Sequence, residues 1–323
     1  MERLSWLTRR RVLAGAALAV YAAIAVKLLG GLPASRDVLV PLLIGGFLLL
    51  SIGSVTRLRR LGVSLAVDWL PFVLMLWLYD LVRGYADGLW LGIHVRPQID
   101  VDRWLGLGSV PTVWLQQHLW HGDADLRWYD YATWLVYMSY FFGTTAVLAV
   151  LWWKAPALFR RFAAMVVALA FVGCATYVLF PAAPPWLAGE DGDIPLVDRL
   201  IGPVSGHVPI VKFEPLWESG TQYSNAVAAV PSLHAGYTFL IVLFLFPRLR
   251  SPFRYLLWLY PPAMAFALVY SGEHYFVDVL VGWLYAAVVY AAVDGGATVL
   301  RRRRDRDPAA RLLPQGDVYV LDD

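Results

Sequence analysis

Long apolar runs recur along this chain and are separated by short polar or basic segments. Runs of about 20 apolar residues are long enough for an α-helix to cross a bilayer. The pattern predicts eight membrane-spanning helices, with ends placed to within a few residues. They are expected near residues 12–29, 38–55, 63–82, 131–152, 162–180, 233–246, 255–270 and 275–293. The sixth is short at its polar start, as expected if its first turn lines a site instead of facing lipid.

Composition agrees with the hydropathy pattern. The chain has 323 residues, of which 59% are hydrophobic and 16% are charged, against about 25% charged in a soluble domain. We therefore expect an all-α polytopic membrane helix bundle. The lone cysteine, Cys174, lies inside an apolar run, so neither an internal disulfide nor a Cys/His zinc motif is expected. The basic start lacks a clear cleavage site and predicts a retained first helix.

The basic residues predict the orientation in the membrane. Every second connection between spans is rich in arginine or lysine, which places those connections and both termini in the cytoplasm. The other loops, including those that carry the candidate chemistry described below, then face outward in the cell membrane. The residues that carry this prediction are Arg9–Arg11, Arg57, Arg59, Arg60, Lys154, Arg160, Arg161, Arg248, Arg250, Arg254 and Arg301–Arg304.

Two outer segments are longer than simple turns. Residues 83–130 contain Trp104, Trp114, Trp120 and Trp128 among Gly, Pro and Asp, a composition typical of an interfacial helix. Residues 181–230 are rich in Gly, Pro and acidic residues and could cap a site as a lid. We expect one integral membrane domain over residues 1–294, with a catalytic core at 96–292. Residues 295–323 are expected to form a charged, flexible cytoplasmic tail.

His234 lies in Val-Pro-Ser-Leu-His-Ala at the start of an apolar run. Ser232 is a plausible N-cap of that helix, and Pro231 precedes it. The exposed backbone N–H groups of this turn, including that of Leu233, and the helix dipole attract phosphate. His234 would then protonate a leaving oxygen. The alternative is an interfacial histidine bonded to a backbone carbonyl.

His274 lies in Gly-Glu-His-Tyr-Phe-Val-Asp, and Asp278 follows it by four residues on the same helical face. An aspartate at the entry of a span is costly unless it is paired or faces a cavity. A carboxylate that accepts from one imidazole nitrogen leaves the other free to attack phosphorus. The alternative is a structural His–Asp cap. Glu273 beside them either helps to bind a polyol or faces water.

Metal and serine-hydrolase chemistry are not favoured. Two histidines and one aspartate can bind a metal, but the remaining carboxylates, Asp68, Asp80, Asp87, Asp100 and Asp102, form no compact ligand motif. A Gly-x-Ser-x-Gly elbow is absent. We expect neither a required metal nor a cofactor.

Three ordered stretches carry a specific resemblance: Pro181–Trp186, Asn225–Ala235 and His274–Asp278. On these stretches the chain resembles the type 2 phosphatidic acid phosphatase superfamily, and within it the inositol phosphorylceramide synthase-like branch. The resemblance covers roughly residues 96–292 and implies a six-helix phosphatase-like core. It also implies that His274 is the nucleophile that becomes phosphorylated, that Asp278 orients it, and that His234 is the acid/base.

The chain departs from that family at two cations. The Lys-x6-Arg-Pro motif of the ordinary phosphatases is not intact, because Arg96-Pro97 lacks the preceding lysine. Leu268 also stands six residues before His274, where those enzymes have arginine. Without both cations a dianionic phosphate monoester binds less well than a phosphodiester. The candidate substrate-binding residues are Ser232, Leu233, Asn225, Lys212, Arg96 and Glu273.

The sequence favours a phosphotransferase. A phospholipid such as phosphatidylinositol would donate its phosphorylated headgroup to His274, and a lipid or other alcohol would accept it. Hydrolysis of a lipid phosphate or polyprenyl diphosphate is the alternative among enzymes. A lipid transporter or scramblase, or a docking protein with a dead site, are the non-enzymatic alternatives. We expect no nucleic-acid partner; an accessory subunit, the oligomeric state and the acceptor stay open.

Overall fold

The computed structural model describes residues 16–25, 27, 42, 45–46, 62–85, 92–208 and 226–306. Over these residues the chain is helical, with two isolated β-bridges, His94 to Ala182 and Ala182 to Ala228, and no strand. The expected all-α class is confirmed.

The elements comprise long helices and short ones. In chain order they are the π-helix η1 (Leu65–Trp69), α4 (Leu70–Tyr85), α5 (Arg96–Leu105), α6 (Pro111–Leu119), α7 (Trp128–Lys154), α8 (Pro156–Leu179), α9 (Pro185–Glu190), α10 (Ile201–Gly206), α12 (Leu233–Leu245), the 3₁₀-helix η3 (Pro252–Leu259), α13 (Tyr260–Tyr270) and α14 (Phe276–Arg306).

Within the part of the chain that the structure describes, four helices are long and apolar enough to cross a bilayer, namely Gly62–Val82, Trp128–Lys154, Pro156–Leu179 and Phe276–Gly296. Two shorter apolar helices, Ala16–Ala25 and Leu233–Leu245, coincide with the first and sixth predicted spans. The sixth is short, as predicted. Most of the second predicted span, 38–55, lies outside the described residues. The chain is therefore a multi-pass membrane protein.

The seventh predicted span differs from the expected helix. Residues 252–259 form a 3₁₀-helix, and the α-helix begins only at Tyr260. Pro261 and Pro262 follow at once. Proline lacks a backbone N–H and is tolerated in a first turn but not in a helix interior. An α-helix running unbroken from residue 255 is therefore disfavoured.

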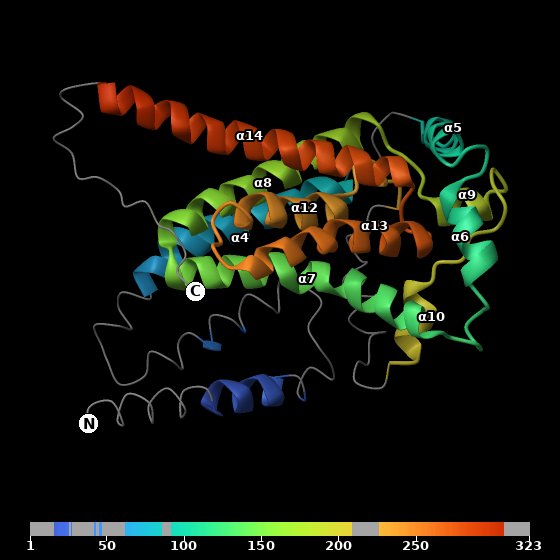
Figure 1. The fold of residues 1–323 in the computed structure, drawn as a ribbon, viewed down its shortest axis with the longest axis horizontal. Helices are drawn as coiled ribbons and strands as arrows, with labels where there is room; N and C mark the ends of the chain where they lie inside the picture. The colour runs from blue at the N-terminus through green and yellow to red at the C-terminus, as the bar shows by residue number, and fades with distance from the viewer. Residues whose placement is uncertain are drawn as a thin grey trace. The chain divides into compact units, whose positions relative to one another are not determined.

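The chain forms two compact units, residues 1–75 with 205–222, and residues 76–204 with 223–323. In the second unit, α12 contacts α7, α8, α13 and α14 (Figure 1). Glycines bring α12 and α14 close together: a Cβ on Gly236 would lie 3.2 Å from the Gly282 carbonyl oxygen, and a Cβ on Gly282 would collide with the Ser232 carbonyl oxygen. This close approach joins the two histidine-bearing segments.

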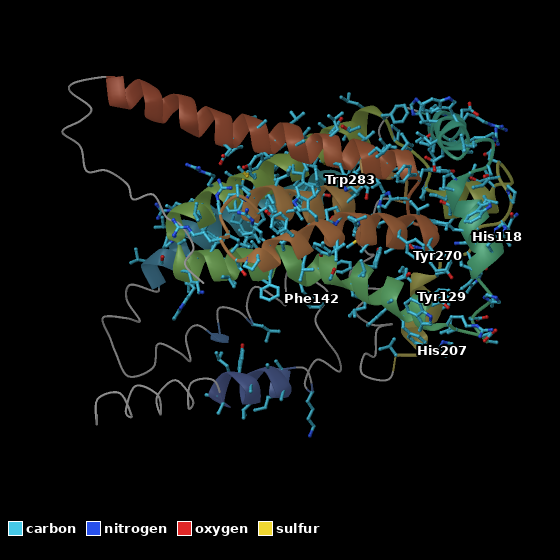
Figure 2. The ribbon with its side chains drawn as sticks, viewed as in Figure 1. His118, Tyr129, Phe142, His207, Tyr270 and Trp283 are labelled. Carbon is cyan, nitrogen blue, oxygen red and sulfur yellow. The ribbon has the colours of Figure 1, made fainter. Side chains whose placement is uncertain are left out.

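Short helices cover the end of this unit where α13 ends and α14 begins (Figure 1). The outer segment 83–130 forms two of them, α5 and α6, instead of one interfacial helix. The chain turns between them through Leu107 (φ 54°) and Gly108 (φ 108°). At the same end Tyr129 and Tyr270 lie side by side, with ring centroids 6.2 Å apart (Figure 2).

Helix α14 continues to Arg306, beyond the domain end expected at residue 294. Residues 307–323 lie outside the described part. Asp294 accepts bonds from Arg161 at 3.2 Å and from Arg248 at 2.7 Å. Helix α8, the segment just after α12, and α14 are thus tied together about 27 Å along α14 from Phe276, at about 1.5 Å per residue.

Candidate active site

His234 is the second residue of α12. Ser232 caps this helix, since its hydroxyl accepts the Ala235 N–H at 3.3 Å, which confirms the predicted cap. The preceding carbonyl, of Pro231, accepts the Tyr177 hydroxyl at 2.8 Å. Ser232 and Leu233 are buried. The first turn of α12 is therefore fixed both by its own cap and by α8.

His274 lies in the turn between α13 and α14. The Leu268 carbonyl accepts the N–H groups of both Glu273 and His274 at 3.2 Å. Gly272 has φ 79°, and a Cβ there would lie 2.7 Å from the Asp198 carbonyl oxygen. Glycine is required at this position both by the backbone conformation and by the close approach. Leu268, where the phosphatases have arginine, is fully buried.

Asp278 lies in the first turn of α14 and is 0% exposed. Its Oδ2 accepts the Tyr275 N–H at 2.9 Å and lies 3.4 Å from Nδ1 of His274. This distance is longer than the about 2.7–2.9 Å of a charge-assisted bond. The Asp278 carbonyl accepts the Ser232 N–H at 3.0 Å. The two histidine-bearing segments are thus bonded through the backbone of Asp278.

The two histidine rings have centroids 5.8 Å apart. Three residues of α7 surround His234: Tyr137 stacks on it at 5.0 Å, Tyr140 lies at 4.0 Å, and Phe141 lies edge-on at 6.2 Å. Their spacing, i, i+3 and i+4, puts them on one face of α7. The sequence reasoning did not single out these aromatic residues, although their spacing was a readable signal.

Asp102 of α5 binds the start of α14. Its two carboxylate oxygens accept the N–H groups of Phe276 and Val277, each at 2.8 Å. Burial raises the pKa of Asp102 to about 6, the Asp278 charge adds to the shift, and the two N–H bonds oppose it. The sequence reasoning set Asp102 aside as a scattered carboxylate. The structure places it as the cap of the helix that carries Asp278.

The outer segment after α8 clamps the His274 turn. Gln116 of α6 donates to the Tyr270 and Asp198 carbonyls and accepts the Asp198 N–H, all at 2.9 Å. Trp186 N–H donates to the Gly272 carbonyl and Leu200 N–H to the Ser271 carbonyl, both at 3.2 Å. The part of this segment that the structure describes therefore packs onto the turn.

The predicted substrate-binding residues divide into three groups. Ser232 and Leu233 lie beside His234, and Glu273 lies beside His274. Arg96 is 68% exposed and bonds Asp193 at 3.0 Å, so its ionic partner is a carboxylate of the outer segment. Lys212 and Asn225 lie outside the described residues. The structure adds Arg199, which the sequence reasoning missed: it bonds Glu273 through two nitrogens, at 2.7 and 3.1 Å.

A membrane helix bundle that brings two histidines and an aspartate together at one end is typical of a polytopic membrane enzyme. The family model described as the PAP2 superfamily matches residues 98–292, more than half of the chain. The chain belongs to the PAP2 superfamily. The match agrees with the resemblance inferred over residues 96–292.

Curated relatives place the chain within that superfamily. A phosphoinositol dihydroceramide synthase of Bacteroides thetaiotaomicron is 26% identical over 256 residues, which cover 75% of this chain and 81% of that protein. An inositol phosphorylceramide synthase of Candida albicans is 31% identical over 170 residues, half of this chain and 35% of that protein. No solved structure matches the chain. Family membership and these relatives support a phosphotransferase enzyme, and within the superfamily the chain is similar to the inositol phosphorylceramide synthase-like branch.

Proposed function

We propose that this protein moves a phosphorylated headgroup from a phospholipid to a lipid hydroxyl through a phosphohistidine at His274. The observation that carries the proposal is the geometry of three side chains: the His234 and His274 rings lie 5.8 Å apart, and the Asp278 carboxylate lies behind His274. That arrangement supplies a nucleophile, a group that orients it and a separate acid/base.

In the first half-reaction, Nε2 of His274 attacks the phosphorus of the donor. Nδ1 faces Asp278, which favours the tautomer with the lone pair on Nε2. The N–P bond forms as the bond from phosphorus to the diacylglycerol oxygen breaks. His234 gives its proton to that leaving oxygen, so diacylglycerol departs neutral.

In the second half-reaction, the acceptor hydroxyl attacks the same phosphorus. His234, now neutral, takes the proton of the hydroxyl, the N–P bond breaks, and His274 is restored. The aromatic residues around His234 support this role, because they hold its ring in place while it gains and loses charge. Water in place of the hydroxyl would give hydrolysis.

The donor and acceptor classes rest on the relatives. Their names join a phosphorylated inositol to ceramide or dihydroceramide. We propose phosphatidylinositol as donor and the hydroxyl of a ceramide-type lipid as acceptor. Leu268 and the incomplete lysine motif support a diester donor over a dianionic monoester, since a phosphodiester carries one negative charge and needs fewer cations.

We propose that the site faces away from the cytoplasm and that both termini are cytoplasmic. His274 and Asp294 lie near opposite ends of the apolar part of α14, and about 27 Å is close to the hydrocarbon thickness of a bilayer. Arg161, near the start of α8, and Arg248, just after α12, bond Asp294, and both belong to the basic clusters that the positive-inside rule assigns to the cytoplasm.

The test uses purified full-length protein in detergent with phosphatidylinositol labelled in the inositol phosphate, with and without ceramide. We expect labelled inositol phosphorylceramide and unlabelled diacylglycerol as products. His274→Ala is expected to abolish both turnover and an acid-labile labelled enzyme. The matched control is His118→Ala, an exposed histidine on α6 whose Nδ1 bonds the Trp114 carbonyl (Figure 2).

Three results would contradict the proposal. Turnover in folded His274→Ala protein at the wild-type rate would exclude His274 as nucleophile. Release of free inositol phosphate at the same rate with and without ceramide would make the protein a hydrolase. Movement of lipid in sealed vesicles without any product would make it a transporter.

A further inference from the structure

Arg199 is bonded to the residue that precedes the nucleophile that we propose. Its Nε and Nη2 bond the two carboxylate oxygens of Glu273, at 2.7 and 3.1 Å, and Glu273 immediately precedes His274. This paired geometry is the fork that arginine forms with carboxylates and phosphates, and lysine cannot reproduce it. The position of the guanidinium is therefore tied to that of the His274 turn.

Arg199 also contacts a tryptophan that is bonded to the same turn. Its guanidinium carbon lies 5.1 Å from the ring centroid of Trp186, and the Trp186 N–H bonds the Gly272 carbonyl. The residue after Arg199 bonds the same turn, through Leu200 N–H and the Ser271 carbonyl. Arg199 and its supports thus form one assembly with the turn that carries His274.

The Arg199 guanidinium is partly exposed at the protein surface, whereas the Glu273 carboxylate that it bonds is buried. The Arg199 side chain is 37% exposed, whereas that of Glu273 is 9% exposed. Burial lowers the pKa of Arg199, but the charge and hydrogen bonds of Glu273, together with smaller effects of Tyr137 and Glu190, make the net direction upward. Arg199 also interacts electrostatically with Tyr137, whose ring stacks on His234. A permanent positive charge is therefore held on the residue that immediately precedes His274.

We propose that Arg199 binds the phosphate of the donor lipid and that Glu273 tunes this site for a phosphodiester. This inference rests on the proposed function and names the residues that take over from the missing lysine motif and from Leu268. An arginine paired with a glutamate has no net charge. A phosphodiester monoanion can share the guanidinium, but the second negative charge of a phosphate monoester is repelled by the Glu273 carboxylate.

The experiment compares Arg199→Gln, Arg199→Lys and Glu273→Gln with two substrates in mixed micelles, phosphatidylinositol (a diester) and phosphatidic acid (a monoester). Arg199→Gln should lower kcat/KM for both lipids about a hundredfold, mainly through KM, because a charge-assisted contact to phosphate is lost. Arg199→Lys keeps the charge without the fork and should fall between Arg199→Gln and the wild type. Glu273→Gln should raise the monoester-to-diester ratio of kcat/KM about tenfold.

Arg103→Gln is the matched control, since Arg103 is an exposed arginine whose ionic partner is Asp100 at 3.7 Å. It should change neither KM nor the substrate ratio. A purely structural ion pair makes a different prediction: Arg199→Gln and Glu273→Gln break the same bond, so they would lower both activities alike. Equal losses in the two variants, or an unchanged KM in folded Arg199→Gln protein, would overturn the proposal.

A binding measurement separates this proposal from the proposed function. The shift in unfolding temperature caused by phosphatidylinositol micelles is compared between His274→Ala and His274→Ala/Arg199→Gln protein, in which no chemistry is required. A smaller shift in the double variant supports phosphate binding by Arg199 even if wild-type protein makes no inositol phosphorylceramide. Equal shifts reject Arg199 as the phosphate-binding residue even if the wild type is fully active.

Discussion

The two histidines of the site have neighbours of different kinds. His234 is surrounded by rings from one helix, α7, which lie four residues apart or less. His274 is held by a turn, by the Asp278 carboxylate and, through α14, by Asp102, which is 174 residues away from Phe276 in the chain. A proton carrier needs an environment that accepts both its charge states, whereas a nucleophile needs one fixed direction. The contrast fits the two roles that we propose.

The largest expected effect comes from the carboxylate behind the nucleophile. Asp278→Asn keeps the size of the side chain but removes the charge that faces Nδ1 of His274. We expect turnover to fall by about 10²–10⁴, with a matching loss of phosphohistidine. His234→Ala should lower turnover by a similar factor but slow both half-reactions, because His234 protonates the leaving oxygen and then deprotonates the acceptor hydroxyl. The label that does form in His234→Ala should therefore persist when ceramide is added. Quenched-flow measurement of this decay distinguishes the two variants, and equal decay rates would contradict their assignment.

The second prediction concerns Asp102 and the stability of the His274 side. Its raised pKa means that the folded protein holds this proton more tightly than the unfolded chain. The stabilising contribution of Asp102 is therefore complete below its ordinary pKa of 3.8 and is lost as pH rises through about 6. With a shift of about two pKa units, the loss is about 3 kcal/mol.

Asp102→Asn removes this titration. At pH 4 the wild type should unfold at a higher temperature than Asp102→Asn. This advantage should shrink, or reverse in favour of the variant, as the pH is raised to 7.5. The amide can accept only one of the two N–H bonds from Phe276 and Val277, so a constant cost is added at every pH. A difference that stays flat or grows with pH would refute the raised pKa. Asp100→Asn, on the exposed side of α5, is the control.

Much of the fold could be predicted from the sequence, because apolar run length alone determines which helices cross a bilayer. The helices at Trp128–Lys154, Pro156–Leu179 and Phe276–Gly296 appear where the hydropathy placed them. The break before Tyr260 was missed, because hydropathy does not register the two prolines that follow it. The three proposed catalytic residues were found because each lies in a local motif.

The residues that support the site could not be found in this way. Asp102 and Arg199 act on a turn that is remote in the chain, and nothing near them in sequence names the partner. A partial signal exists for Asp102, since it shares the buried face of α5 with Gln98 and Ile99 at helical spacing. A polar residue on a buried face indicates a partner but does not identify it.

The third prediction tests the aromatic surroundings of His234. Tyr140→Ala should lower kcat roughly threefold to tenfold, because an aromatic contact contributes about 0.5–1.5 kcal/mol and its loss frees the His234 ring. Tyr140→Phe keeps the ring and should stay within about twofold of wild type. Steady-state kinetics on both variants checks this. A larger loss in Tyr140→Phe than in Tyr140→Ala would mean that the hydroxyl, and not the ring, matters.

The smallest effect is expected at Tyr275, next to the nucleophile. Its backbone N–H bonds Asp278, but its buried hydroxyl has no hydrogen-bond partner among the described residues. Tyr275→Phe keeps the N–H and removes an unsatisfied polar group, so stability should stay the same or rise by up to about 1 kcal/mol, with activity unchanged. The matched variant is Tyr270→Phe, an equally buried tyrosine whose hydroxyl donates to Asp130 at 2.6 Å. That change leaves a buried carboxylate short of a donor and should cost about 1–3 kcal/mol of unfolding free energy.

Chemical denaturation of the two variants, side by side, measures these changes in the free energy of unfolding. A comparable loss in both would show that the Tyr275 hydroxyl, as well as its backbone, holds the His274 turn.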